Sequence, residues 1–264
     1  MCWIGAKCEG QNKMLSPLFH RSVSRWARSG FALSVLASLT VMMSGLGSRW
    51  GWWHFGTGFQ LLKWGVYIGL SAASTSLIAS ILTRPGGTRH GFKWAILGFF
   101  ISLVVVGVPW SWLQTARRVP PIHDISTDTE NPPSFVAILP LRKDAPNSAE
   151  YGGPEIAVRQ HTAYPEVKPA KLNRSPDLAF AQVLATARER GWDIVAADLN
   201  EGRIEATDTT LWFGFKDDIV IRIIPVDKGS RVDVRSVSRV GLSDVGTNAR
   251  RIQNFLDQLY RAPD

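Results

Sequence analysis

The sequence predicts three N-terminal transmembrane α-helices followed by an α+β domain, in which an antiparallel sheet has two helices packed on one face. Three observations carry this prediction. Apolar stretches of membrane-spanning length fill the first 114 residues, the charge balance changes after them, and from Trp192 the hydrophobic pattern has a period of two between two helical patterns. These changes divide the chain into a cytoplasmic N-terminal tail (1–29), a three-span membrane region (30–114) and a soluble domain (115–264).

The basic residues are concentrated in the first half of the chain. Residues 1–114 contain ten lysines and arginines and a single acid, Glu9, whereas residues 115–264 contain 20 basic and 21 acidic residues. A protein that binds nucleic acid presents a cationic surface, and the soluble half has no net positive charge to form one. We therefore expect no nucleic-acid partner. The only cysteines, Cys2 and Cys8, precede the first apolar stretch, so the soluble half has no disulfide and no cysteine-based metal site.

The three predicted spans run from Gly30 to Gly47, from Leu61 to Leu82 and from Trp94 to Leu113. The length of each span is close to the roughly 20 apolar residues that are needed to cross a lipid bilayer. We therefore expect the lipid bilayer to be a permanent partner of the protein. The second span contains the small residues SAASTS, which let helices approach closely, so we expect it to pack against the other two. A cleaved secretory signal is an alternative for the first span, but its length and the tryptophan-rich loop after it favour a retained anchor.

Positive charges flank the spans at one end: Arg21, Arg25 and Arg28 precede the first span, and Arg84, Arg89 and Lys93 lie between the second and the third. Because basic segments remain in the cytoplasm, we expect a cytoplasmic N-terminus and a soluble domain on the opposite face. In a Gram-negative bacterium this places the protein in the inner membrane and the domain in the periplasm. Translation starts at Met1 or at Met14, and the sequence leaves this choice open.

The segment Arg117–Pro176 is rich in proline and is predicted to be mostly irregular. We expect it to wrap around the core with one or two short strands, because a simple linker would not need its apolar residues Phe135, Ile138 and Ile156. A helix over Asp177–Arg190 follows, with Ser175 and Pro176 at its start and Gly191 after its end.

Five strands are predicted next: Trp192–Ala197, Arg203–Thr209, Leu211–Phe215, Asp218–Pro225 and Arg231–Ser238. The short connections between them allow only antiparallel neighbours. Alternation places isoleucine and valine on one face of the sheet and charged residues on the other. A final helix is predicted over Asp244–Arg261, capped by Ser243, with its apolar side against the sheet.

Three separated blocks of the soluble half resemble a known family. They are IHDISTD at Ile122–Asp128, IEATDTTLWFGFKDD at Ile204–Asp218 and VDVRSVSRVGLSDVGTNARRI at Val232–Ile252. They look like the conserved blocks of the domain-of-unknown-function family 1499 (DUF1499) and occur in its order. The resemblance covers nearly all of residues 115–260. It implies a bacterial or photosynthetic-organelle protein whose domain often follows membrane spans, and it implies no established activity.

The candidate ligand-binding site joins the charged sheet face to the start of the last helix. Its residues are Arg222, Arg235, Arg239, Asp208, Asp218, Asp244, Asn248 and Arg251. Arginines beside a helix N-terminus can hold a phosphate, a sulfate or a lipid headgroup. The alternative is a ladder of cross-strand ion pairs, for instance Arg222 with Asp233, with Asp244 capping its own helix.

Histidine and carboxylate residues suggest a metal site only weakly. His123 lies close in sequence to Asp124 and Asp128, but the only other histidine of the domain is His161, so a loop with turn-capping side chains is the better interpretation. We expect no cofactor and no bound metal.

Other combinations of residues are equally weak evidence for catalysis. Ser236 or Ser238 with His161 and an aspartate would supply hydrolase residues, but no motif supports this arrangement. The aromatic residues Trp212 and Phe213 are typical of core packing, and an apolar-ligand groove under the sheet is the functional alternative.

We therefore expect a non-enzymatic, membrane-anchored protein of the cell envelope. Its extracytoplasmic domain would bind a partner protein or an anionic envelope component such as an anionic lipid. Two alternatives remain open: a module that binds a lipid or another apolar ligand, and an unrecognised hydrolase. The sequence identifies neither the ligand nor the oligomeric state.

Overall fold

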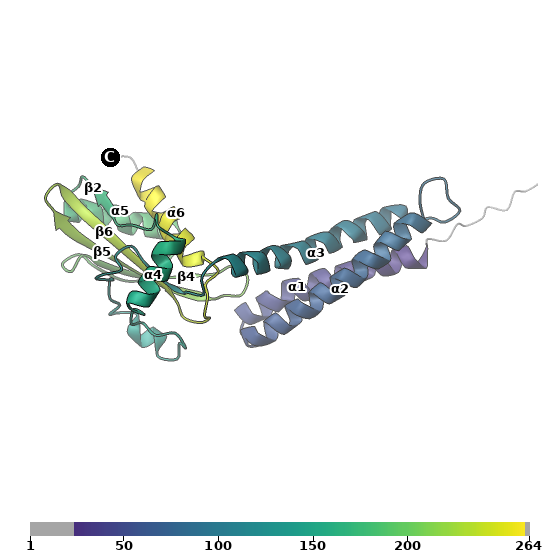
Figure 1. The fold of residues 1–264 in the computed structure, drawn as a ribbon, viewed down its shortest axis with the longest axis horizontal. Coiled ribbons are helices and arrows are strands. Elements are labelled where there is room, and N and C mark those ends of the chain that lie inside the picture. Colours follow the sequence, from purple (N-terminus) through teal and green to yellow (C-terminus); the bar gives the residue numbers. More distant parts are fainter. Residues whose placement is uncertain (1–23, 262–264) are drawn as a thin grey trace, which may run out of the picture.

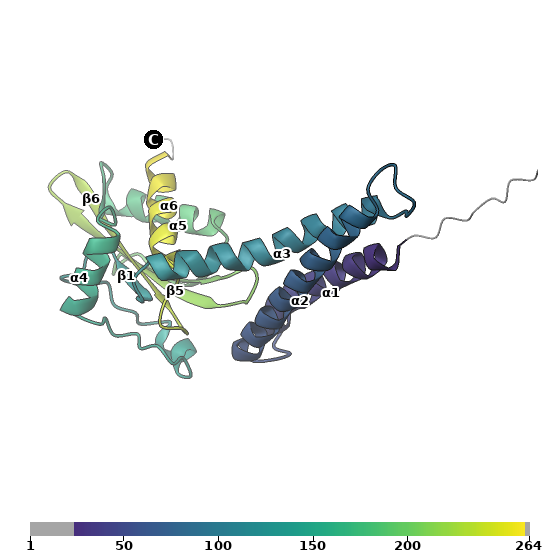
Figure 2. The same ribbon diagram turned by 45° about the vertical axis from the view of Figure 1, so that its right-hand side comes forward.

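A computed structural model describes residues 24–261. Three long apolar helices, α1 (Arg25–Arg49), α2 (Phe55–Leu82) and α3 (Phe92–Arg118), pack together and are long and apolar enough to cross a membrane (Figure 1). Each helix extends beyond its predicted span, because the prediction followed only the apolar run of each helix. The end of α3 leaves the bundle and leads into the α+β domain (Figure 2).

The second helix packs against the other two, as its small residues predict. A Cβ atom added to Gly30 of α1 would lie 2.5 Å from the Ser76 Oγ of α2, and one added to Gly98 of α3 would lie 2.8 Å from the same atom. Glycine is therefore needed on both sides of Ser76 for the helices to approach so closely. The protein is an integral membrane protein.

The domain contains one six-stranded antiparallel sheet, and the predicted α+β fold is confirmed. Its central path has the order β1–β6–β5–β4–β3, and β2 also pairs with β6. The strands are β1 (Asp124–Ser126), β2 (Ala170–Leu172), β3 (Asp193–Asp198), β4 (Arg203–Thr209), β5 (Lys216–Val226) and β6 (Gly229–Ser238).

The apolar face of the sheet packs against two helices, α5 (Pro176–Glu189) and α6 (Thr247–Arg261). Within this core, Ile221 of β5 lies opposite Val234 of β6, as the alternation predicts. The Trp192 ring stacks on the Phe255 ring of α6, with their centroids 5.0 Å apart. The helices are thus held to the sheet by buried apolar side chains, which are the main source of stability in a domain without disulfides.

The other face of the sheet is also covered. Phe135 and Ile138, from the segment before the short 3₁₀ helix η1 (Leu139–Arg142), pack on Val220 of β5 and Val237 of β6. The proline-rich segment therefore wraps around the sheet, and it contains two short strands, β1 and β2, where one or two were expected.

Two helix predictions need correction. The helix α4 (Pro154–Ala163) was not predicted, because its proline was interpreted as a breaker although proline fits the first turn of a helix. The last helix begins at Thr247 and not at Asp244. The Asp244 carboxylate accepts hydrogen bonds from the backbone N–H groups of Gly246 and Asn248, so Asp244 and not Ser243 caps this helix.

The predicted strand Leu211–Phe215 is wrong. These residues form a loop between β4 and β5, closed by a hydrogen bond from the Phe215 N–H to the Thr210 Oγ1 at 2.8 Å and by a positive φ of 71° at Gly214. The aromatic side chains of this loop lie against α1 and α2 and not in the domain core. They gave the sequence a strand-like composition although their contacts are with the membrane region.

Candidate functional site

The eight candidate residues do not form one site. Arg222, Asp218, Arg235 and Arg239 lie on the polar face of the sheet. Asp208, Asn248 and Arg251 lie on the helix-covered face, and Asp244 lies in the loop before α6. Alternation along β4, β5 and β6 explains this division, because residues an odd number of positions apart point to opposite faces.

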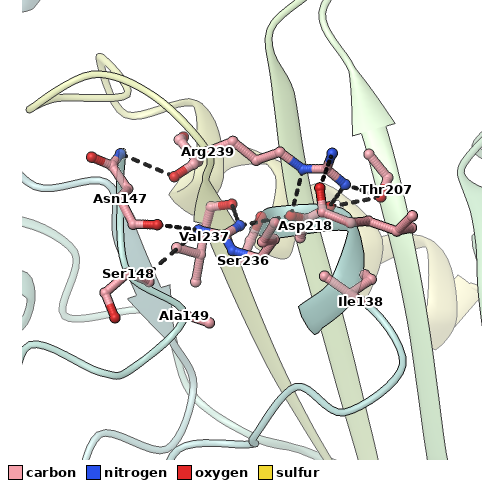
Figure 3. Close-up of polar contacts among 12 residues, drawn as sticks. Ile138, Asn147, Ser148, Ala149, Thr207, Asp218, Ser236, Val237 and Arg239 are labelled. Atoms are coloured by element: carbon pink, nitrogen blue, oxygen red, sulfur yellow. Dashed lines mark hydrogen bonds and ion pairs between the residues drawn. The ribbon is translucent and has the colours of Figure 1, made fainter. Parts of the chain in front are cut away.

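On the polar face, Asp218 lies between two guanidinium groups, and Figure 3 shows its contacts with one of them, that of Arg239. Its carboxylate accepts hydrogen bonds from Arg142 Nη1 at 2.6 Å and from Arg239 Nε and Nη2, both at 2.8 Å. The Thr207 Oγ1 donates a fourth bond at 2.7 Å. Burial raises the pKa of Asp218, but the bonds from Arg239, Thr207 and Arg142 outweigh it and hold the pKa below 3.8.

Arg235 is buried in an ion pair with Asp124 of β1. The guanidinium donates to both carboxylate oxygens, at 2.9 and 2.8 Å, and lies over the rings of Phe135 and Tyr151, 5.3 and 5.4 Å from their centroids. Burial raises the pKa of Asp124 more than the Arg235 bonds lower it. It also raises the pKa of Tyr151 to about 12. Asp124 is therefore the carboxylate partner of the buried Arg235, although burial makes its own ionisation less favourable in the folded protein.

Arg222 and Arg231 share two carboxylates. Both donate to Asp128, at 2.9 and 2.8 Å, and both donate to the fully buried Asp233, the Arg222 bond measuring 2.8 Å. The predicted pair of Arg222 with Asp233 is therefore present. Burial raises the pKa of Asp128, but backbone N–H groups and the two arginines lower it further, so the net shift is downward.

On the helix-covered face, Arg251 of α6 connects the ends of two strands. It donates to Asp208 at 2.8 Å and to Asp217 at 2.6 Å. Asn248 accepts a bond from Ser236 Oγ and donates to Ser238 Oγ. Burial raises the pKa of Asp244, the residue that caps this helix, more than its backbone hydrogen bonds lower it. These side chains join α6 to the sheet.

Three structurally important residues were missed in the sequence. Glu205 is fully buried on the polar face, where its carboxylate accepts backbone N–H bonds from Val136, Ala137 and Ile138 at 2.9–3.0 Å. Arg142 pairs with Asp218, and Arg231 pairs with Asp128. These contacts join segments that are far apart in the chain, so no local pattern pointed to them.

A hollow of about 260 Å³ opens on the polar face between β4, β5 and the wrapping segment. It is lined by Asn131, Pro132, Pro133, Ser134, Val136, Glu201, Arg203, Val220 and Arg222. Of the eight candidate residues, only Arg222 lines it. The side chains of Arg203 and Arg222 remain 20% and 22% exposed, and each already faces carboxylates: Glu201 and Glu205 for Arg203, Asp128 and Asp233 for Arg222. The hollow thus contains both charges and apolar walls.

The residues considered for catalysis have other partners. His161 Nε2 lies 2.9 Å from Thr129 Oγ1, and His123 Nδ1 lies 3.4 Å from the carbonyl oxygen of Leu242. Ser236 and Ser238 bond to Asn248. Within residues 24–261, no group of three or more histidine, cysteine, aspartate and glutamate side chains is placed to hold a metal ion.

Two comparisons with known families match this arrangement. A family model described as "Protein of unknown function (DUF1499)" matches residues 124–259, which is the sheet with its helices. A model described as "Negative regulator of sigma F" matches residues 13–141, so the membrane region is similar to that family. No curated protein matches the chain.

Proposed function

The chain belongs to the DUF1499 family, and we propose that it is a membrane-anchored binding protein whose domain holds a segment of a partner protein. The hollow on the polar face is the proposed binding site. We also propose that the chain is divided as the sequence predicts, into a tail (1–29), a membrane region (30–114) and a soluble domain (115–264). We further propose that the domain lies outside the cytoplasm, because basic residues are concentrated at the ends of the spans that lie away from the domain. If the membrane is a bacterial inner membrane, the domain is then in the periplasm.

The arginines of the candidate site are already paired with carboxylates, and this pairing favours a protein ligand over an anion. Each guanidinium of the candidate site faces at least one carboxylate, so an incoming phosphate would have to compete with groups that are already paired. A polypeptide fits the hollow better, since Pro132 and Val136 offer accessible apolar contacts and Arg203 and Glu201 offer both charges at its rim. The proposed interface is small, as in a weak or transient complex.

A photo-crosslinking amino acid at Ser134 tests this proposal in cells that make the full chain. Ser134 is exposed and lines the hollow. We expect a protein adduct from position 134, its loss in a Val136→Asp background, and no such adduct from the control position Leu178. Leu178 is 61% exposed on α5, on the other side of the sheet. Lipid adducts alone at position 134, or equal protein adducts at both positions, would rule out the proposal.

A second candidate function is regulation across the membrane. The similarity of residues 13–141 to the family "Negative regulator of sigma F" supports it, and so does the contact of the β4–β5 loop with α1 and α2, which gives the domain a direct route to the membrane helices. Deleting the chain should then change the transcripts that depend on one sigma factor. A variant with the loop contact removed by Phe213→Ala should reproduce that change, whereas an unchanged transcript profile in the deletion strain would exclude this role.

A further inference from the structure

The loop between β4 and β5 contacts the C-terminal part of α1 and the N-terminal part of α2. We call residues 210–215 the aromatic loop. The Trp212 Nε1–H donates to the carbonyl oxygen of Met42 in α1 at 3.1 Å. The Phe213 ring lies 4.9 Å from that of Phe59 in α2, and the Phe215 ring lies 5.7 Å from that of Phe55. The loop is therefore seated on the α1–α2 hairpin.

Two glycines make room for this contact. A Cβ atom on Gly45 would lie 2.3 Å from Trp212 Cδ1, and one on Gly58 would lie 2.9 Å from Phe213 Cε1. Real Cβ atoms do not approach other atoms so closely, so the helices offer a flat surface at the two positions where the aromatic rings pack. At Gly58 an added Cβ atom would also lie 2.4 Å from the Ser44 carbonyl oxygen, so this glycine lets α1 and α2 approach each other as well.

The contact lies at the depth of the bilayer. Met42 comes seven residues before the last residue of α1, which is about 10 Å along the helix axis at 1.5 Å per residue. Beyond that end, Trp50 and Trp52 are 54% and 63% exposed, as is usual for the aromatic belt at the membrane–water interface. The Trp212 indole therefore reaches past this belt towards the hydrocarbon, whereas the loop backbone at Thr210 and Leu211 lies beside Arg49.

The aromatic loop is suited to a low-dielectric environment. It contains no charged residue between Asp208 and Lys216. The Arg49 Nη1 donates to the carbonyl oxygens of Thr210 and Leu211 at 2.7 and 3.1 Å, and the Gly214 N–H donates to the Thr210 carbonyl at 3.1 Å. Irregular backbone at membrane depth is tolerated when its polar groups are paired in this way.

We infer that the aromatic loop is inserted into one leaflet of the bilayer and that Leu211 contacts lipid acyl chains. Leu211 is 85% exposed, although it directly precedes Trp212 and Phe213, whose side chains pack on α1 and α2. The bilayer that surrounds the three helices continues to this position, so lipid is the occupant that covers the side chain. The domain is then fixed to the membrane at two places, the end of α3 and this loop.

Spin labels in the full chain, reconstituted in lipid nanodiscs, test this inference. In a background with Cys2 and Cys8 changed to serine, one label replaces Leu211, a second replaces Leu39 in the middle of α1, and a third replaces Leu178 on α5; all three leucines are exposed. Collisions with oxygen report lipid, and collisions with a water-soluble nickel complex report water. We expect the Leu211 label to show a ratio of oxygen to nickel collisions severalfold higher than the Leu178 label and nearer to that of the Leu39 label.

A ratio equal to that of the Leu178 label would overturn the inference. Dipolar broadening between Leu211 labels would also overturn it, because a second copy of the chain would then cover the leucine. A photo-crosslinking residue at position 211 provides a second measurement without a spin label, and lipid adducts are the expected product. Protein adducts without lipid adducts would contradict lipid contact.

Discussion

Arg235 and Asp124 are joined by two hydrogen bonds inside the domain, from Nε to Oδ1 at 2.9 Å and from Nη2 to Oδ2 at 2.8 Å. Both side chains are at least nine-tenths buried. Arg235 was a candidate for ligand binding from the sequence, and this pairing gives it a structural role as well. Its replacement therefore tests stability before it tests binding.

We predict that Arg235→Met lowers the free energy of unfolding by about 3–5 kcal/mol, because it leaves the Asp124 carboxylate buried without its partner. Chemical denaturation in detergent measures this change. Arg159→Met is the matched control. Arg159 pairs with Glu155 on the surface of α4, and such exposed pairs contribute only about 0.5 kcal/mol. Equal losses in the two variants would contradict the assignment.

Glu205 tests how the proline-rich segment that wraps around the sheet is held in place. Glu205→Gln removes the charge that accepts three backbone N–H bonds, and we expect it to reduce stability by about 2 kcal/mol. The segment around Val136 should then be cut faster in limited proteolysis. Glu201→Gln, at the exposed end of the same strand hairpin, should leave the cleavage rate close to that of the wild type. If the two variants are cut at the same rate, Glu205 does not hold the segment.

Strands β4, β5 and β6 were predictable because their side chains alternate between the two faces of the sheet. The observed β4 has the predicted limits, Arg203–Thr209, and the partner of Arg222 was also predictable, since Asp233 lies opposite it in the β5–β6 register. Arg142 and Glu205 act on segments more than 65 residues away in the chain. A single sequence has no local signal for such contacts, so the division of the charged residues between two faces could not be completed from it.

For the aromatic loop, the sequence predicted a strand that the structure does not contain. Its composition, with Trp212 and Phe213 beside two threonines, is typical of a strand, and the prediction placed it in the sheet. The apolar surface that attracts these rings is the α1–α2 hairpin, more than 150 residues earlier in the chain. The tertiary contact outweighed local propensity because the glycines of both helices leave room for the rings.

Asp218 predicts a specific dependence of stability on pH. Its pKa lies below 3.8 in the folded protein, so the folded state binds this proton less tightly than the unfolded state does. The stabilisation is therefore fully present above the unfolded value of 3.8 and is lost as the pH falls through the lower, folded-state pKa. We expect Asp218→Asn to be less stable than the wild type at pH 7, with a difference that shrinks as the pH falls below about 4.

Denaturation curves at several pH values measure this difference. Asp124 and Asp244 have raised pKa values and act with the opposite sign, but they are common to both proteins and largely cancel in the comparison. Asp144→Asn, at an exposed position, is the control and should stay close to the wild type throughout. A difference for Asp218→Asn that grows towards acid pH would show that the sign is wrong.

A single added methyl group at Gly45 would occupy the space on α1 into which the Trp212 ring packs. Gly45→Ala places a Cβ atom against Trp212, and we expect the thermal midpoint in nanodiscs to fall by about 2–10 °C. Gly107→Ala is the matched control in α3, because a Cβ atom there meets nothing within 4 Å. This control should not lower the midpoint. Unchanged stability of Gly45→Ala would show that Trp212 does not pack on α1 in the membrane.

The proposed topology places the domain and the loop formed by residues 83–91 on opposite sides of the membrane. Single cysteines that replace Leu178 in the domain and Arg89 in that loop, in a chain without Cys2 and Cys8, test this in bacterial spheroplasts with an impermeant maleimide. We predict that the cysteine at 178 reacts in intact spheroplasts and the cysteine at 89 reacts only after the membrane is opened. Reaction of the cysteine at 89 alone, or of both from the same side, would contradict the account.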